Sequence, residues 1–178
     1  MTSEKPVRKP LPRLSFVLGG ARSGKSRHAE ALVEACPPPW VYVATAQAFD
    51  SEMEARIAEH RARRPEGWIT RDAPLALPEA IREGPSRAPI LVDCLTLWVT
   101  NLILAERDPA AAGAALEAAC RDAPGPVVLV SNEVGLGIVP DNALARRFRD
   151  EAGRLHQRLA AQADAVTFMV AGLPMRVK

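Results

Sequence analysis

Residues 18–26 read LGGARSGKS, and this stretch decides the fold. The apolar run LSFVL at 14–18 precedes it, and an alanine-rich helical pattern over 24–35 follows it. Residues 19–26 match G-x-x-x-x-G-K-[ST], which forms a phosphate-binding loop where it joins a strand to a helix. The stretch therefore predicts a nucleoside triphosphate site at a strand–helix junction.

The residue types in this loop explain how it would hold phosphate. Glycines let the chain curl so that successive N–H groups point at phosphate oxygens, and the following helix adds the partial positive charge of its N-terminus. Lys25 would neutralise the outer phosphates, and Ser26 would ligate Mg²⁺. The predicted nucleotide-binding positions in the loop are Gly19, Gly20, Ala21, Arg22, Ser23, Gly24, Lys25 and Ser26.

Apolar runs and helical patterns alternate along the rest of the chain. The pattern predicts strands at 14–18, 40–45, 88–94, 126–132 and 165–172, and helices at 24–35, 51–64, 75–83, 95–106, 109–122 and 141–162. Residues 66–74 read as a short polar stretch without an assigned element. Strands that are apolar on both faces predict a mainly parallel sheet covered by helices. We therefore expect a three-layer αβα fold, with 14–178 as one domain after a flexible basic tail at 1–13.

The last predicted helix has the clearest periodicity. Apolar residues from Leu144 to Leu159 recur three or four positions apart, which is typical of one face of a helix. Asp141 and Asn142 are the alternative caps at its start.

Composition excludes several classes of protein. A net charge of +2 gives no electrostatic case for binding nucleic acid. The apolar run after the basic tail is shorter than the ~20 residues that a membrane span needs, so we expect no span. The three cysteines, Cys36, Cys94 and Cys120, are widely spaced and form no zinc or disulfide pattern. A reducing, cytoplasmic environment fits them best.

Asp93 is the candidate second metal ligand. It ends the apolar run ILVD, and ligands gather at the carboxyl ends of strands in open α/β sheets. A carboxylate there could complete a Mg²⁺ site with Ser26. Capping of the helix predicted at 95–106 is the competing interpretation, and the two roles can coexist.

His60 is the candidate nucleophile. Three arginines follow it within 61–64, and nearby cations keep an imidazole unprotonated. A neutral imidazole can attack phosphorus, and arginines suit the phosphate that it attacks. From the residues alone, packing on the helical face shared with Met53 and Ile57 is the favoured interpretation, and catalysis is the alternative.

Four segments together carry a family resemblance. They read GGARSGKSRHAEAL, VYVATAQAFDSEMEARIAEHRARRPEGWIT, ILVDCLTLWVTNL and VLVSNEVGLGIVPDNALARRFRDEAGRLHQRLAAQADAV. In order and spacing they resemble the bifunctional adenosylcobinamide kinase / adenosylcobinamide-phosphate guanylyltransferase family of cobalamin biosynthesis. The resemblance runs from about residue 15 to the C-terminus, apart from the region around 107–122.

The resemblance implies two successive reactions. The family phosphorylates the aminopropanol hydroxyl of adenosylcobinamide with ATP or GTP, in the presence of Mg²⁺. It then takes GMP from GTP onto a histidine and passes it to that phosphate, giving adenosylcobinamide-GDP. His60 is the position that matches the family's nucleophile, so the resemblance implies that His60 and Lys25 are catalytic.

The resemblance also implies the surroundings of the site. Family folds are similar to RecA-like or adenylate-kinase-like phosphate-loop folds, and the family assembles as homotrimers with the site between subunits. Trp68, Trp98 and residues 134–139 are candidates for contacting the corrinoid. Further nucleotide contacts match Ala44, Thr45, Ala46, Arg61, Ala62, Arg63, Arg64, Asp72 and Asp93, although the family often has glutamate at the last two.

Two other functions compete. A small-molecule or nucleotide kinase of the same fold, without guanylyl transfer, would explain the phosphate loop and Asp93 but not His60 and its arginines. A GTP-binding switch would need an N-K-x-D element, and the nearest match, NEVG at 132–135, lacks its lysine and aspartate.

Overall fold

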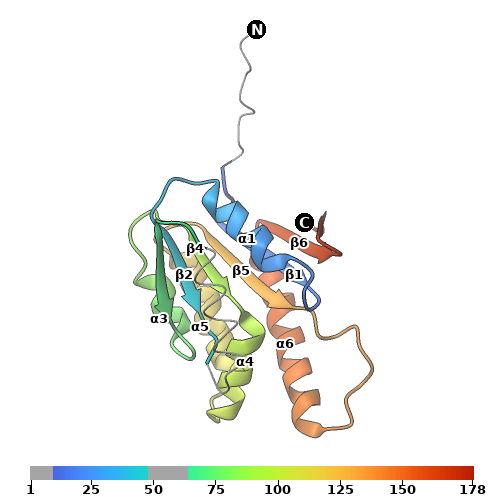
Figure 1. Cartoon of the computed structure of the whole chain (residues 1–178). Coiled ribbons are helices and arrows are strands. Elements are labelled where there is room, and N and C mark those ends of the chain that lie inside the picture. The colour runs from blue at the N-terminus through green and yellow to red at the C-terminus, as the bar shows by residue number, and fades with distance from the viewer. Residues whose placement is uncertain (1–9, 48–63) are drawn as a thin grey trace.

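The computed structural model describes residues 10–47 and 64–178. Their strands form one sheet in the order β3-β2-β4-β5-β1-β6-β7 (Figure 1). All neighbouring strands are parallel except β6 and β7, which form an antiparallel hairpin. The strands are β1 (Leu14–Gly19), β2 (Trp40–Ala44), β3 (Trp68–Asp72), β4 (Ile90–Asp93), β5 (Val127–Asn132), β6 (Ala165–Val170) and β7 (Leu173–Arg176).

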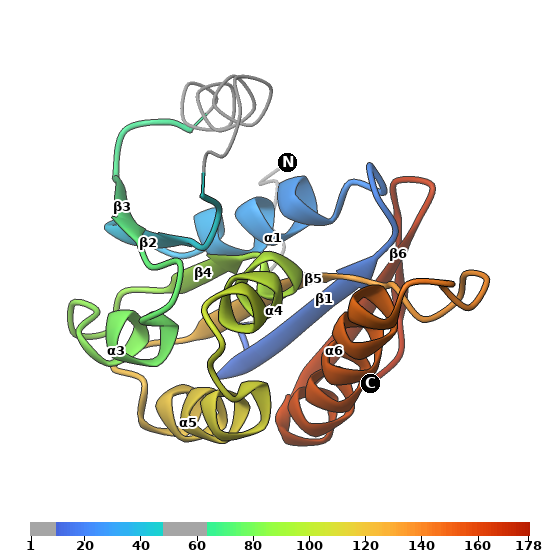
Figure 2. The same cartoon turned by 90° about the horizontal axis from the view of Figure 1, so that it is seen from below.

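Helices cover both faces of the sheet, as Figure 2 shows. On one face α1 packs over β1, β4 and β5, burying Ala29 and Val33. The larger core lies on the other face and includes Trp98 of α4, which is fully buried. The described helices are α1 (Lys25–Glu34), α3 (Leu77–Arg82), α4 (Leu95–Leu104), α5 (Pro109–Asp122) and α6 (Ala143–Gln162).

The predicted αβα fold with a mainly parallel sheet is confirmed, and each predicted element within the described residues is present with ends shifted by a few positions. The helix predicted at 51–64 lies outside the described residues except for its last position, as does the tail at 1–9. Arg13, the last residue of the tail predicted at 1–13, is described and donates hydrogen bonds to the carbonyls of Arg121 and Ala123. Among the described helices, none combines the length and apolarity needed to cross a membrane.

Two strands went unrecognised in the sequence. β3 pairs with β2 along 68–72, where no element was expected, because an edge strand with mostly exposed residues lacks an apolar signature. The prediction of one strand over 165–172 was wrong at its end, because the chain turns at Ala171 and Gly172, both with positive φ. The turn leads into β7, whose residues are all exposed.

Candidate nucleotide site

The phosphate loop lies between β1 and α1, as its sequence requires. Gly24 precedes the first turn of α1 with φ 88°, a conformation that favours glycine. At Gly19 a Cβ would lie 2.5 Å from Ser23 Oγ and 2.9 Å from the Met169 carbonyl oxygen, so only glycine fits there. The amide of Gly172 donates to the Ser23 carbonyl at 3.1 Å, so the β6–β7 turn braces the loop. Close packing thus fixes the curvature that phosphate binding needs.

Lys25 lies inside this loop rather than in solvent. Its side chain is buried, and Nζ donates to the Gly20 carbonyl at 2.9 Å. Burial lowers the pKa of Lys25, whereas the nearby charges of Asp93 and Cys94 raise it. Ser23 Oγ is also buried, and within the described residues it has no hydrogen-bond partner. A buried ammonium and an unsatisfied hydroxyl are groups that a phosphate could engage.

Acidic residues stand in a row at the carboxyl edge of the neighbouring strands. Ala44 at the end of β2 is in register with Asp72 on β3 and with Asp93 on β4. The N-cap of α4 is Cys94, and no side-chain hydrogen bond caps that helix. The structure therefore removes the helix-capping interpretation of Asp93, whose carboxylate is close enough to affect Lys25.

Thr45 faces inward at this edge. Its side chain is fully buried, and Oγ1 donates to the Cys94 carbonyl at 2.7 Å and accepts from the Cys94 amide at 2.9 Å. Asn101 on α4 donates to the Thr45 carbonyl at 2.8 Å. This network joins the end of β2 to the peptide that follows Asp93. Thr45 therefore supports the site through buried backbone contacts, and Ala46, which is half-exposed, is the more accessible of the pair.

Sequence reasoning missed two residues beside the loop. Asn132 at the end of β5 is in register with Gly19, and its side-chain amide donates to Thr96 Oγ1 at 3.2 Å. The amide of the next residue, Glu133, donates to the Gly19 carbonyl at 3.0 Å. Because β5 lies between β1 and β4, both residues stand between the phosphate loop and Asp93. The signal that could have found them is that two polar residues, Asn132 and Glu133, come at the end of an apolar strand.

The predicted nucleophile, His60, lies outside the described residues, and so do Arg61, Ala62 and Arg63. Arg64 is described, and its guanidinium carbon lies 3.6 Å from the centroid of the Tyr42 ring. The structure therefore brings Asp93 close to Lys25 of the loop, places Asp72 and the last arginine of the run at the β2–β3 side of the sheet, and does not place the histidine.

Comparison with known proteins assigns the family. Residues 15–177 match the family model described as cobinamide kinase / cobinamide phosphate guanyltransferase. The chain belongs to this family. It is 54% identical over 167 residues to the bifunctional adenosylcobalamin biosynthesis protein CobP of Pseudomonas aeruginosa, covering 92% of this chain and 96% of that protein. It is 49% identical over 180 residues to the bifunctional adenosylcobalamin biosynthesis protein CobU of Salmonella typhimurium, covering 92% and 98%.

Solved structures agree with the fold of this family member. A prototypical ATPase from the type III secretion system of pathogenic bacteria aligns with a TM-score of 0.57 at 11% identity, covering 90% of this chain and 52% of that one. The fold is therefore a P-loop NTPase-type α/β fold, as the phosphate loop predicts.

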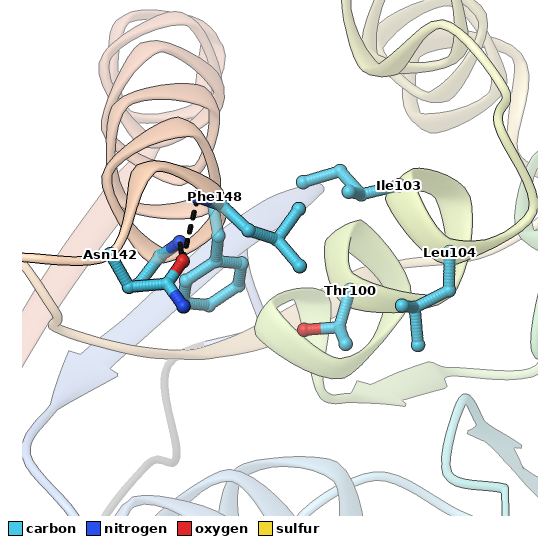
Figure 3. Close-up of a pocket in the computed structure, with 7 residues that line it drawn as sticks. Thr100, Ile103, Leu104, Asn142 and Phe148 are labelled. Carbon is cyan, nitrogen blue, oxygen red and sulfur yellow. Dashed lines mark hydrogen bonds between the residues drawn. The ribbon is translucent and has the colours of Figure 1, made fainter.

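A groove between α4 and the start of α6 is the second feature of the surface. Figure 3 shows Asn142 and Phe148 on the α6 side facing Thr100 and Leu104 on α4. The groove has a volume of 330 Å³ and an almost wholly apolar lining. Its residues are Thr100, Ile103, Leu104, Asn142, Leu144, Ala145 and Phe148.

The corrinoid-contact candidates fall into two groups. Trp98 is fully buried and its Nε1 donates to the Leu75 carbonyl, so it is a core residue and cannot touch a substrate. Trp68 packs against Trp40 and Tyr42 and donates to Glu34. By contrast, the segment 134–139 exposes the large apolar side chains of Leu136, Ile138 and Val139.

Proposed function

We propose that this chain phosphorylates the aminopropanol hydroxyl of adenosylcobinamide with ATP or GTP and then transfers GMP from GTP to that phosphate, giving adenosylcobinamide-GDP. The observation that carries the proposal is the buried Lys25 inside a glycine loop beside Asp93, in a chain that belongs to the cobinamide kinase / cobinamide phosphate guanyltransferase family. The bifunctional relatives support both reactions.

In the kinase step, the substrate hydroxyl attacks the γ-phosphorus and the bond to the β-phosphate oxygen breaks. Lys25 and the loop amides hold the phosphates and stabilise the negative charge that develops on the transferred group. The helix dipole of α1 acts in the same direction. The rigid backing of the loop by the β6–β7 turn keeps these donors in place before the nucleotide arrives.

Mg²⁺ fits the residues beside the loop. The Ser26 hydroxyl and the Asp93 carboxylate are hard oxygen ligands of the kind that Mg²⁺ prefers, and few protein ligands are usual because nucleotide phosphates supply others. When bound with the nucleotide, Mg²⁺ neutralises phosphate charge.

In the transfer step, His60 is the proposed nucleophile. Its imidazole nitrogen forms a bond to the α-phosphorus of GTP, and pyrophosphate leaves as the α–β bond breaks. The phosphate of adenosylcobinamide phosphate then attacks the same phosphorus, and the nitrogen–phosphorus bond breaks. His60 is four residues from Arg64, a separation that spans at most about 14 Å of extended chain. Because Arg64 lies over Tyr42, this short tether supports a nucleophile close to the same nucleotide.

The corrinoid would lie along the exposed apolar segment 134–139 and the groove between α4 and α6. This segment follows the end of β5, where the Glu133 amide donates to the Gly19 carbonyl of the phosphate loop. A substrate bound along the segment would therefore reach the nucleotide site. The groove would take only an apolar edge of so large a molecule. Ile138→Asp should raise the KM for adenosylcobinamide without changing GTP affinity, and an unchanged KM would move the corrinoid elsewhere.

Assembly and location complete the proposal. We expect a homotrimer, since the family resemblance implies one, and sedimentation equilibrium should give three copies of the 19.2 kDa chain. The three cysteines are free thiols, which fits a cytoplasmic enzyme.

The deciding experiment incubates the protein with GTP labelled at the α-phosphate. The wild-type protein and a His28→Gln control should acquire an acid-labile, base-stable label, whereas His60→Ala should not. His60→Ala should retain kinase turnover with adenosylcobinamide. Normal GMP transfer by His60→Ala would place the nucleophile elsewhere, and a wild type that phosphorylates but never takes label would favour a kinase without guanylyl transfer.

A further inference from the structure

Tyr42 contacts both the predicted metal ligand and the arginine segment. It lies on β2 two positions before Ala44, the register partner of Asp93, so its side chain and Asp93 are on the same face of the sheet. The tyrosine is 6% exposed, and the Asp93 carboxylate is close enough to its hydroxyl to interact with it.

The ring of Tyr42 holds a second group. The Arg64 guanidinium carbon lies 3.6 Å from the ring centroid, the geometry of a cation–π contact. Arg64 also donates to Thr70 Oγ1 at 3.0 Å, and Thr70 is the register partner of Tyr42 on β3. Trp68 contacts the ring edge-on at 77°. The guanidinium is therefore fixed against the sheet by neighbouring residues of β2 and β3.

We propose that Tyr42 is a positioning residue that fixes Asp93 and Arg64 relative to one another, so that the metal-ligand side and the arginine side of the site act on one bound nucleotide. This inference rests on the proposed function, which gives Asp93 and the arginine segment their roles. Outer hydrogen bonds of this kind orient ligating carboxylates and commonly alter metal affinity when removed. A packed guanidinium keeps its charge and its donors in one place.

The two contacts can be separated chemically. Tyr42→Phe removes the hydroxyl and keeps the ring, so it breaks only the contact with Asp93. Tyr42→Leu removes both contacts. Arg64→Gln removes the guanidinium from the ring and from Thr70 but leaves Tyr42 in place, and because Arg64 is half-exposed this variant should fold even if Tyr42→Leu does not. Trp40→Phe is the matched control, since it removes a donor from the same aromatic cluster, whose partner is the Cys36 carbonyl.

The role of the Tyr42 hydroxyl is tested by measuring Mg²⁺-dependent nucleotide binding, without any reaction. A fluorescent GDP analogue is titrated into the full chain at increasing Mg²⁺ concentration. Tyr42→Phe should need about tenfold more Mg²⁺ for half-maximal binding, with recovery at excess Mg²⁺. Trp40→Phe should match the wild type. A Tyr42→Phe curve within twofold of the wild type, or one that excess Mg²⁺ does not restore, would overturn the role at Asp93.

The ring is tested with α-labelled GTP at saturating Mg²⁺. Tyr42→Phe should label at nearly the wild-type rate, whereas Arg64→Gln and Tyr42→Leu should label at least tenfold more slowly and bind a fluorescent GTP analogue more weakly. Labelling and GTP binding by Arg64→Gln at the wild-type level would overturn the role of the ring. If the wild type takes no label, the guanylyl-transfer proposal fails by itself, and the Mg²⁺ and GTP titrations still decide the role of Tyr42.

Discussion

Lys25 shows how the loop prepares for a charged ligand. Its ammonium is buried and donates to the Gly20 carbonyl, while Asp93 and Cys94 offset part of the desolvation that lowers its pKa. Burying a cation with few partners costs desolvation free energy, so an anion that binds beside Lys25 is strongly favoured.

We predict that Lys25→Ala weakens the binding of a fluorescent GTP analogue by roughly 10- to 100-fold, since a hydrogen bond to a charged group is worth about 1.5–3 kcal/mol. Both the kinase and the transfer reactions should slow if they share this nucleotide. Lys178→Ala is a suitable control, because that exposed lysine bonds the carbonyls of Ala160 and Ala161. Intact kinase turnover in Lys25→Ala would contradict a phosphate-binding role for the loop.

His156 shows a different use of a buried polar side chain. On α6, its Nε2 lies 2.7 Å from Ser131 Oγ, and its ring contacts Phe16. Burial lowers the pKa of His156, although the nearby charge of Glu133 raises it. The folded protein therefore holds the neutral imidazole, which binds the strand that ends at Asn132.

The lowered pKa of His156 makes folding stability depend on pH in a definite direction. Below about pH 6.5 the unfolded chain takes up a proton before the folded chain does, so this residue's contribution is present above pH 6.5 and is lost as the pH falls. Urea denaturation should show a larger loss of unfolding free energy between pH 7.5 and 5.5 for the wild type than for His156→Gln. Equal losses in the two proteins would mean that His156 does not titrate between the states.

At the scale of the element, α6 is stabilised at its first turn by one side chain. Asn142 Oδ1 accepts from the amides of Leu144 and Ala145 at 2.8 and 3.1 Å, so Asn142, rather than Asp141, is the cap. Asn142→Ala should lower the unfolding free energy by about 1 kcal/mol in urea denaturation. Asp141→Ala should change it by a few tenths, since the contact of Asp141 seen within 10–47 and 64–178 is through its backbone carbonyl, which accepts from Arg146. A comparable loss in both variants would disprove the assignment of the cap.

Elements with one strong local signal were predictable, and those that depend on their neighbours were not. The apolar runs of β1, β4 and β5 sit in the centre of the sheet, so their own residues specify burial on both faces. β3 and β7 are the two edges, and pairing with a neighbour rather than apolar composition makes them strands. The stripe of α6 was half right for a related reason: Leu155 and Leu159 are buried, whereas Leu144 is 51% exposed beside the groove.

The candidate site divides in the same way. The glycine loop and Asp93 were predictable because a short continuous motif and the end of an apolar strand carry them. The places of Tyr42 and Asn132 were not, and Thr45, which the resemblance named as a nucleotide contact, has a buried backbone-bonding role that was not predicted either, because these roles depend on which strands are adjacent in space. Strand order cannot be deduced from chain order here, since β5 is inserted between β4 and β1.

On the scale of the whole molecule, one edge of the sheet gathers every described part of the site. β1, β2, β4 and β5 all end there. Hydrogen bonds among Thr45, Cys94, Thr96 and Asn132 link the ends of β2, β4 and β5, and the Glu133 amide links the end of β5 to β1. The larger hydrophobic core packs beneath the helices on one face of the same sheet. A ligand at the edge therefore binds to several strands at once and should stabilise the fold as a unit.

This coupling can be measured as a shift in thermal unfolding. A ligand that binds only the folded state stabilises it by about 2.7 kcal/mol at a hundred times its Kd, and each kcal/mol raises the Tm of a domain of this size by roughly 2–4 °C. Saturating GTP with Mg²⁺ should therefore raise the Tm by about 5–10 °C, and by clearly less in Lys25→Ala at the same concentrations. A shift confined to one spectroscopic probe, with calorimetry unchanged, would show that the nucleotide stabilises a local segment and not the sheet that carries the site.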